Sequence, residues 1–171
     1  MTGEAVPGEG ALSAEQIAFL IESGSFTAER LAEVSARVAR GDLEARERKT
    51  REDTIDASLR PDEVAARLGL DAAEVRRRTA EGQLYAFRAQ EEERYPTWQF
   101  TDDPASPVLP GLAAVIAAFP AGVHPATIRG FMSTPQRRAH IDGVRVTPVD
   151  WLLRAGDPQV LRDILDGFLL S

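Results

Sequence analysis

Arginine is the residue type in this sequence whose spacing best suits a chemical task. Three arginines, Arg76 to Arg78, stand together in a segment of helical character, and Arg88 and Arg94 flank an acidic turn further along the chain. A guanidinium group forms two parallel hydrogen bonds with the edge of a guanine base, and it also binds phosphate oxygens. This pattern indicates recognition of nucleic acid, provided that the fold exposes these arginines on one surface.

The helical period predicts which of these arginines face outward. Val75 is the large apolar residue of the segment 72–81 and should face the core, and Arg78 and Thr79 share its side because they follow three and four positions later. We therefore expect the opposite side of the helix to contact base edges and the two flanking arginines to contact phosphates. The predicted DNA-binding residues are Ala72, Ala73, Arg76, Arg77, Arg88 and Arg94.

Two helices joined by a tight turn are predicted around these residues. Pro61 suits the first position of a helix that ends at Gly69, and Asp71 suits the cap of a second helix from about 72 to 81. A helix, a glycine-containing turn of about three residues and a second helix form the helix-turn-helix arrangement.

A strand pair is predicted directly after the second helix. Residues 84–88 and 94–100 are rich in aromatic side chains and enclose a polar turn, so they resemble a hairpin wing in which Pro96 keeps one strand at an edge. The acidic residues of the turn would repel a DNA backbone, which limits contact to the base of the wing. The alternative reading of residues 59–100 is a helical hairpin whose arginines form only a solvated face.

This central segment resembles the winged helix-turn-helix domains of the MerR and excisionase type. The resemblance lies in Asp62-Glu-Val-Ala-Ala-Arg-Leu-Gly-Leu70, in Val75, and in Gly82-Gln-Leu-Tyr-Ala-Phe-Arg88. That family usually has an apolar residue where this chain has Arg78. The resemblance implies binding to double-stranded DNA.

The C-terminal part is expected to form a second, small helical domain. Three prolines and two aspartates mark residues 101–110 as a linker, and residues 111–171 combine predicted helices with a short hairpin at Asp142-Gly143. On the simplest reading this domain serves packing or dimerisation, and aromatic residues such as Trp151 are part of its core.

The order of motifs in the last forty residues resembles a toxin-binding domain. Asp142-Gly143, Thr147-Pro-Val-Asp-Trp-Leu152 and Gly156-Asp-Pro158 follow one another as in the C-terminal domain of Xre/MbcA/ParS-type antitoxins. The resemblance implies a partner toxin of the RES type, held by residues of this domain and of the apolar tail. The partner-binding residues implied in this way are Trp151, Gly156, Asp157, Phe168, Leu169 and Leu170.

The N-terminal part is predicted to be helical and acidic. Residues 1–10 indicate a disordered leader, and residues 11–58 indicate helices, the last of them highly charged. The net charge of the chain is -7, and residues 1–58 contribute 12 acidic and 7 basic side chains. This balance argues against a protein that coats nucleic acid by bulk attraction.

The sequence lacks the patterns of an enzyme, a metal site or a membrane protein. It has no cysteine, neither His124 nor His140 has a second ligand four residues away, and no glycine-rich phosphate loop or nucleophile elbow occurs. The leader has no export signal, and no apolar run approaches the ~18 residues that a membrane span needs. We expect no catalytic residue, no metal, no cofactor and a cytoplasmic location.

The sequence thus predicts a mainly α fold with two small hairpins and two candidate functions. One is an antitoxin-like transcriptional regulator that binds operator DNA and neutralises a RES-type toxin. The other is a stand-alone regulator or excisionase-like factor whose C-terminal domain serves dimerisation. In both cases a homodimer would match two DNA half-sites.

Deletion of residues 167–171 tests the toxin-binding role of the tail. An apolar segment of this kind suits a cleft in a partner, so the shortened chain should bind a RES-type toxin more weakly and still bind DNA. The affinity for the toxin is measured by calorimetry on the purified proteins. Equal affinity of the full and shortened chains would reject this role.

Overall fold

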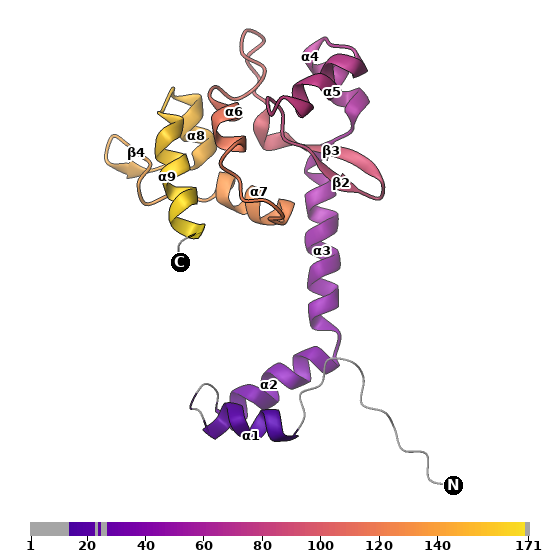
Figure 1. Cartoon of the computed structure of the whole chain (residues 1–171), viewed down its shortest axis with the longest axis vertical. Coiled ribbons are helices and arrows are strands. Elements are labelled where there is room, and N and C mark those ends of the chain that lie inside the picture. The colour runs from indigo at the N-terminus through magenta and orange to yellow at the C-terminus, as the bar shows by residue number, and fades with distance from the viewer. Residues whose placement is uncertain (1–13, 23, 25–26, 170–171) are drawn as a thin grey trace. The chain divides into compact units, whose positions relative to one another are not determined.

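The computed structural model describes residues 14–22, 24 and 27–169, so the predicted leader lies outside the described residues. The chain divides into two compact units, Met1–Lys49 and Thr50–Ser171. Its described part is mainly helical and has small antiparallel sheets (Figure 1). No helix among the described residues has the length and apolar character that a membrane crossing requires.

The first unit contains the N-terminal helices that the sequence predicted. Thr27 caps the second of them, because its hydroxyl oxygen accepts a hydrogen bond from the backbone N–H of Arg30 at 3.2 Å. Leu31 is its buried apolar side chain among the described residues. The helices are α1 (Ala14–Glu22), α2 (Ala28–Ala39) and the start of α3 (Asp42–Asp56).

The second unit begins with the end of α3 and continues into a pair of helices, α4 (Pro61–Leu68) and α5 (Ala72–Ala80). The predicted caps are confirmed. Gly69 ends α4 with φ of 64°, a left-handed conformation that glycine adopts without steric cost. Asp71 starts α5 by accepting a hydrogen bond from the backbone N–H of Glu74 at 2.7 Å. Figure 1 shows the two helices side by side, and they bury Val64 and Val75 in a common core.

The hairpin after α5 is part of a three-stranded sheet, with the strand order β1-β3-β2. The strands are β1 (Ser58–Leu59), β2 (Phe87–Ala89) and β3 (Glu92–Pro96), and all pairs are antiparallel. The edge position predicted for the Pro96 strand is wrong, because β3 lies between β1 and β2. Pro96 is tolerated there as the last residue of its strand, opposite Ser58. The predicted strand is also shorter than expected, since residues Thr97–Gln99 form the 3₁₀ helix η1.

Gln99 connects the two ends of the hairpin. Its side chain is fully buried and its amide accepts a hydrogen bond from the N–H of Tyr85 at 2.9 Å, while its NH₂ group donates to the carbonyl oxygen of Tyr85 at 2.8 Å and of Pro96 at 3.2 Å. Tyr85 precedes β2 and Pro96 ends β3. The amide therefore fixes the base of the hairpin where no backbone ladder continues.

Residues 101–110, which the sequence predicts to be a linker, form an ordered loop. The N–H of Thr101 donates to the carbonyl oxygen of Pro107 at 2.9 Å, and the N–H of Leu109 donates to that of Gln99 at 2.9 Å. An isolated β-bridge pairs Phe100 with Val108. The segment is therefore a loop closed by backbone hydrogen bonds within the second unit.

The C-terminal part packs small helices around its own apolar cluster. Leu112, Val115, Leu152 and Leu161 lie in this cluster, and α6 packs against α9 (Figure 1). The elements are α6 (Leu112–Ile116), α7 (Pro125–Ser133), β4 (His140–Ile141), β5 (Val144–Arg145), α8 (Pro148–Leu153) and α9 (Pro158–Leu169). The predicted hairpin at Asp142-Gly143 is confirmed.

The second unit has two apolar clusters, and three aromatic rings pack against the C-terminal one and join it to the base of the hairpin. Phe119 meets Tyr85 edge to face with 5.6 Å between ring centroids, and it meets Trp98 in the same way at 6.4 Å. Tyr85 and Trp98 stack at 6.0 Å. The base of the hairpin and the C-terminal helices thus share one packed contact.

Replacement of Gln99 by alanine tests the clamp at the hairpin base. The change leaves buried backbone groups of Tyr85 and Pro96 unpaired, so the free energy of unfolding should fall by about 2–4 kcal/mol in chemical denaturation. The control is Gln83→Ala, at an exposed glutamine, which should stay within about 0.5 kcal/mol of the unaltered chain. Similar small losses in both variants would contradict the role given to Gln99.

Candidate nucleic-acid interface

The outward face of α5 carries the residues that the helical period placed there. Ala72, Ala73, Arg76 and Arg77 are exposed, whereas Val75 is completely buried. Thr79 lies on the inner side, and its hydroxyl is 3.0 Å from the phenolic oxygen of Tyr95. The predicted orientation of α5 is therefore confirmed.

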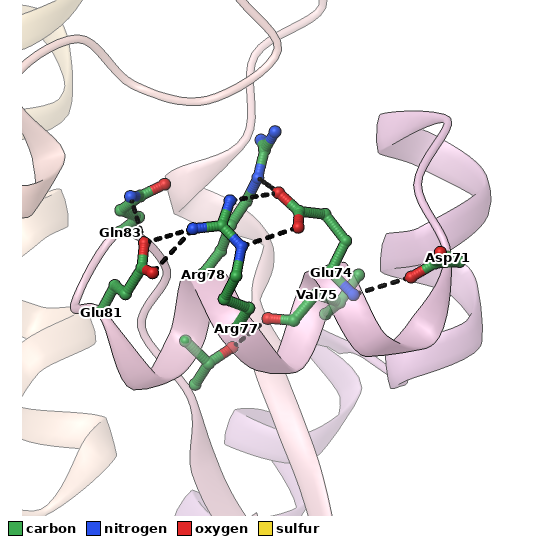
Figure 2. A network of polar contacts seen from close by, with 8 residues as sticks. Asp71, Glu74, Val75, Arg77, Arg78, Glu81 and Gln83 are labelled. Carbon is green, nitrogen blue, oxygen red and sulfur yellow. Dashed lines mark hydrogen bonds and ion pairs between the residues drawn. The ribbon is translucent and has the colours of Figure 1, made fainter.

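Arg77 is exposed but is already engaged in ion pairs within its own helix. Figure 2 shows its guanidinium between two carboxylates, with bonds of 2.6 and 2.8 Å to Glu74 and two bonds of 2.7 Å to Glu81. Both acids lie within one helical turn of Arg77, at the spacings where side chains meet on a helix surface. Arg77 must exchange these partners before it binds any other group.

Arg78 is also paired, and its side chain is partly buried. Its Nε atom donates to Glu74 Oε1 at 3.0 Å, and one third of the side chain is exposed (Figure 2). The sequence predicted an inward position for this residue, because it follows Val75 by three positions. The ion pair with Glu74 lets an arginine occupy this position at the margin of the core, since its stem packs while its charge is compensated.

Arg76 differs from both neighbours. Its side chain is exposed, and it makes no hydrogen bond or ion pair with any of the residues that the structure describes. The arginine run therefore contains one side chain available to a ligand and two that are compensated internally.

Glu74 is the electrostatic centre of this network. Hydrogen bonds from Arg77 and then Arg78 lower the pKa of Glu74 from 4.5 to about 2, and the bonds to Glu74 and Glu81 raise the pKa of Arg77. Glu74 thus stays ionised through the neutral range. Glu74 and Glu81 were not predicted as site residues, although their spacing from Arg77 was a usable signal.

The arginines of the hairpin also face acidic residues. Arg88 is exposed, lies opposite Glu93 in the strand register and donates to the carbonyl oxygen of Glu91 at 3.1 Å. Arg94 lies 3.7 Å from Glu92, and only 20% of its side chain is exposed. Of the two predicted phosphate contacts, Arg88 is the more accessible.

The predicted partner-binding residues of the C-terminal part form an internal turn. The Trp151 indole N–H donates to the carbonyl oxygen of Asp157 at 2.9 Å, and a Cβ atom added at Gly156 would overlap the Trp151 ring. Packing within the chain accounts for these residue types, and their partner-binding role stays a prediction. Leu170 lies outside the described residues, and the structure does not describe the side chains of Phe168 and Leu169.

The two histidines have no common site. His124 Nδ1 accepts a hydrogen bond from the N–H of Ala126 at 3.1 Å and so caps α7, and His140 is exposed on β4. No group of three potential metal ligands occurs in the described part of the chain.

Comparison with known proteins gives little similarity. No family model and no curated protein matches the chain. The chain is similar to the protein in the NMR structure of Rv2175c, with 22% sequence identity, coverage of 64% of this chain and 76% of that one, and a TM-score of 0.41. A likeness at this score carries no argument about function.

The pKa of Glu74 predicts how acid affects the fold. Because its folded pKa lies below its ordinary value, its ion pairs stabilise the fold fully above pH 4.5, and this contribution is lost as the pH falls toward about 2. The difference in Tm between the unaltered chain and Glu74→Gln should therefore shrink as the pH falls through this window. Glu91→Gln, at an exposed glutamate of the hairpin turn, serves as control. A difference for Glu74→Gln that does not depend on pH would contradict the assignment.

Proposed function

We propose that this protein is a transcriptional regulator that binds double-stranded DNA through a winged helix-turn-helix formed by α4, α5 and the hairpin β2–β3. The observation that carries the proposal is the exposed face of α5, on which Arg76 makes no hydrogen bond or ion pair with the described residues. In helix-turn-helix proteins the second helix enters the major groove and its N-terminal residues meet base edges. Helix α5 has the place in the chain and the exposed polar face that this role needs.

The side chains around Arg76 favour close approach to a groove. Ala72 and Ala73 stand in the first turn of α5, are exposed and have only a methyl group each. Small residues at this end let the helix backbone come near the base edges, while Arg76 is long enough to reach a guanine. The partly exposed wing would add a phosphate contact from Arg88 at its side.

The acidic partners of Arg77 and Arg78 favour selectivity over general attraction to DNA. A phosphate or a base that bonds to Arg77 must replace the paired carboxylates of Glu74 and Glu81, so the gain from this contact is small unless its geometry is good. With the overall charge of -7, attraction to an arbitrary duplex is weak. Binding by two copies at two half-sites would compensate for few contacts per copy, and we propose a homodimer on DNA.

A charge-matched pair of variants tests this proposal. A duplex is first selected from a random library by the unaltered chain, and its affinity is measured by fluorescence anisotropy. Arg76→Ala should weaken binding of this duplex about 10- to 100-fold, because one bidentate arginine contact contributes about 1–3 kcal/mol. Arg154→Ala removes the same charge from an exposed position after α8 and should leave the affinity within about twofold.

Two results would overturn the assignment. One is a selection that enriches no duplex at moderate salt. The other is an equal effect of Arg76→Ala and Arg154→Ala, which would reduce the role of Arg76 to net charge.

A further inference from the structure

The C-terminal part contains an apolar cavity that the proposed DNA-binding surface does not use. It has a volume of about 490 Å³ and lies between α7, α9 and the segment that precedes α7. Its walls are mostly apolar, and the residues that the structure describes contribute no charged side chain to them. The main apolar lining residues are Phe119, Val123, Ile128, Phe131 and Leu165.

A glycine in the middle of α7 keeps room at this cavity. Gly130 lines the cavity, does not have a positive φ, and a Cβ added to it would meet no atom within 4 Å. Glycine costs about 1 kcal/mol relative to alanine inside a helix. Neither the backbone conformation nor close packing requires glycine at position 130. The structural effect of this glycine is therefore the space that its missing side chain leaves in the cavity.

Gln136 gives the cavity a fixed polar group. Its backbone N–H donates to the carbonyl oxygen of Val146 at 3.0 Å, and its side-chain NH₂ donates to those of Phe131 at 3.1 Å and Thr134 at 2.8 Å. These bonds hold the amide in one orientation. Its side-chain oxygen receives no hydrogen bond from the described residues and is therefore available as an acceptor.

We propose that this cavity binds a small, uncharged and mainly apolar molecule that donates one hydrogen bond to Gln136. The volume lies in the range of about 300–1,000 Å³ typical of small-molecule sites, and a mainly apolar lining with a few polar groups, here Thr127, Thr134 and Gln136, is their usual composition. The lack of charged side chains in the lining favours a ligand without charge, because an ion would lose its hydration without a counter-charge.

Phe119 connects this cavity to the base of the hairpin. It lines the cavity and contacts both Tyr85, which precedes β2, and Trp98, which follows β3. The Trp98 indole N–H is buried and has no hydrogen-bond partner among the described residues, so a shift of this ring breaks no hydrogen bond of that group. A ligand that moves Phe119 therefore changes the packing on which the hairpin rests. This regulatory step rests on the proposed DNA binding, whereas ligand binding itself does not.

Binding of 1-aminoanthracene to the full chain tests the site. This probe is neutral, apolar and has an N–H donor, and its emission rises in apolar surroundings. We expect saturable binding of one molecule per chain, which Gly130→Phe weakens at least about tenfold by filling the cavity. The control Gly130→Ala also removes the glycine and gains more helix propensity than Gly130→Phe, but it leaves the space open and should bind the probe within about twofold of the unaltered chain. Gly130→Leu replaces Gly130→Phe if circular dichroism finds the latter unfolded.

The site is located by the two indole N–H signals of the ¹⁵N-labelled chain, which come from Trp98 and Trp151. The probe should shift the Trp98 signal and leave that of Trp151 in place. Absence of binding, or equal binding by Gly130→Phe and Gly130→Ala, overturns the proposal. Binding that occurs only after removal of residues 168–171 would identify the chain's own C-terminal segment as the occupant and would also overturn it.

The regulatory step has a separate readout. If the cavity controls the hairpin, saturating probe should change the affinity for the selected duplex at least about threefold, and Gly130→Phe should abolish the response. Probe binding without a change in DNA affinity overturns the regulatory step alone. A chain that binds the probe but no duplex leaves the ligand site intact and rejects the proposed DNA binding.

Discussion

The buried amide of Gln99 is the interaction on which the second unit depends. Its side chain pairs with both backbone groups of Tyr85, and its own carbonyl oxygen accepts the hydrogen bond of Leu109. One residue therefore joins the start of the hairpin, the end of the hairpin and the loop that leads to the C-terminal helices. A buried amide with several partners has few alternative arrangements. Gln99 therefore couples the packing of one apolar cluster to the packing of the other.

Ion pairs between arginine and glutamate determine how much positive charge the candidate interface presents. On α5, three consecutive arginines share a surface with Glu74 and Glu81, and two of the three are neutralised. Counting basic residues would overestimate the positive field of this helix. Arg76 differs because no acidic residue stands three or four positions away from it, where side chains meet on a helix surface. Its availability therefore depends on residue spacing and not on the number of basic residues.

Local signals in the sequence were sufficient for the helices and insufficient for the sheet. Gly69 and Asp71 predicted helix ends correctly because caps depend only on residues within one turn. Strand β1 and the central place of β3 depend on pairing between segments more than thirty residues apart, for which two residues of strand give no signal. The hydrogen bonds that order the loop at 101–110 were not predictable for the same reason, since its prolines and aspartates are typical of ordered and extended connections alike. At the candidate site, the helical period was enough to predict which face of α5 is exposed. The ion pairs of Arg77 could be predicted only from its spacing to Glu74 and Glu81 as well.

The turn of the hairpin has a consequence for how the sheet opens. Gln90 and Glu91 have φ of 51° and 66°, in a two-residue turn where glycine or asparagine is usual. Side chains with a Cβ atom lose about 1–2 kcal/mol each in this conformation. The strained turn lies at the end of the hairpin opposite Gln99, so the ladder between β2 and β3 is weakest at its tip and firmest at its base. Thermal opening of this sheet therefore starts at Gln90 and proceeds toward Tyr85, and backbone amides near the tip exchange with solvent without unfolding of the rest.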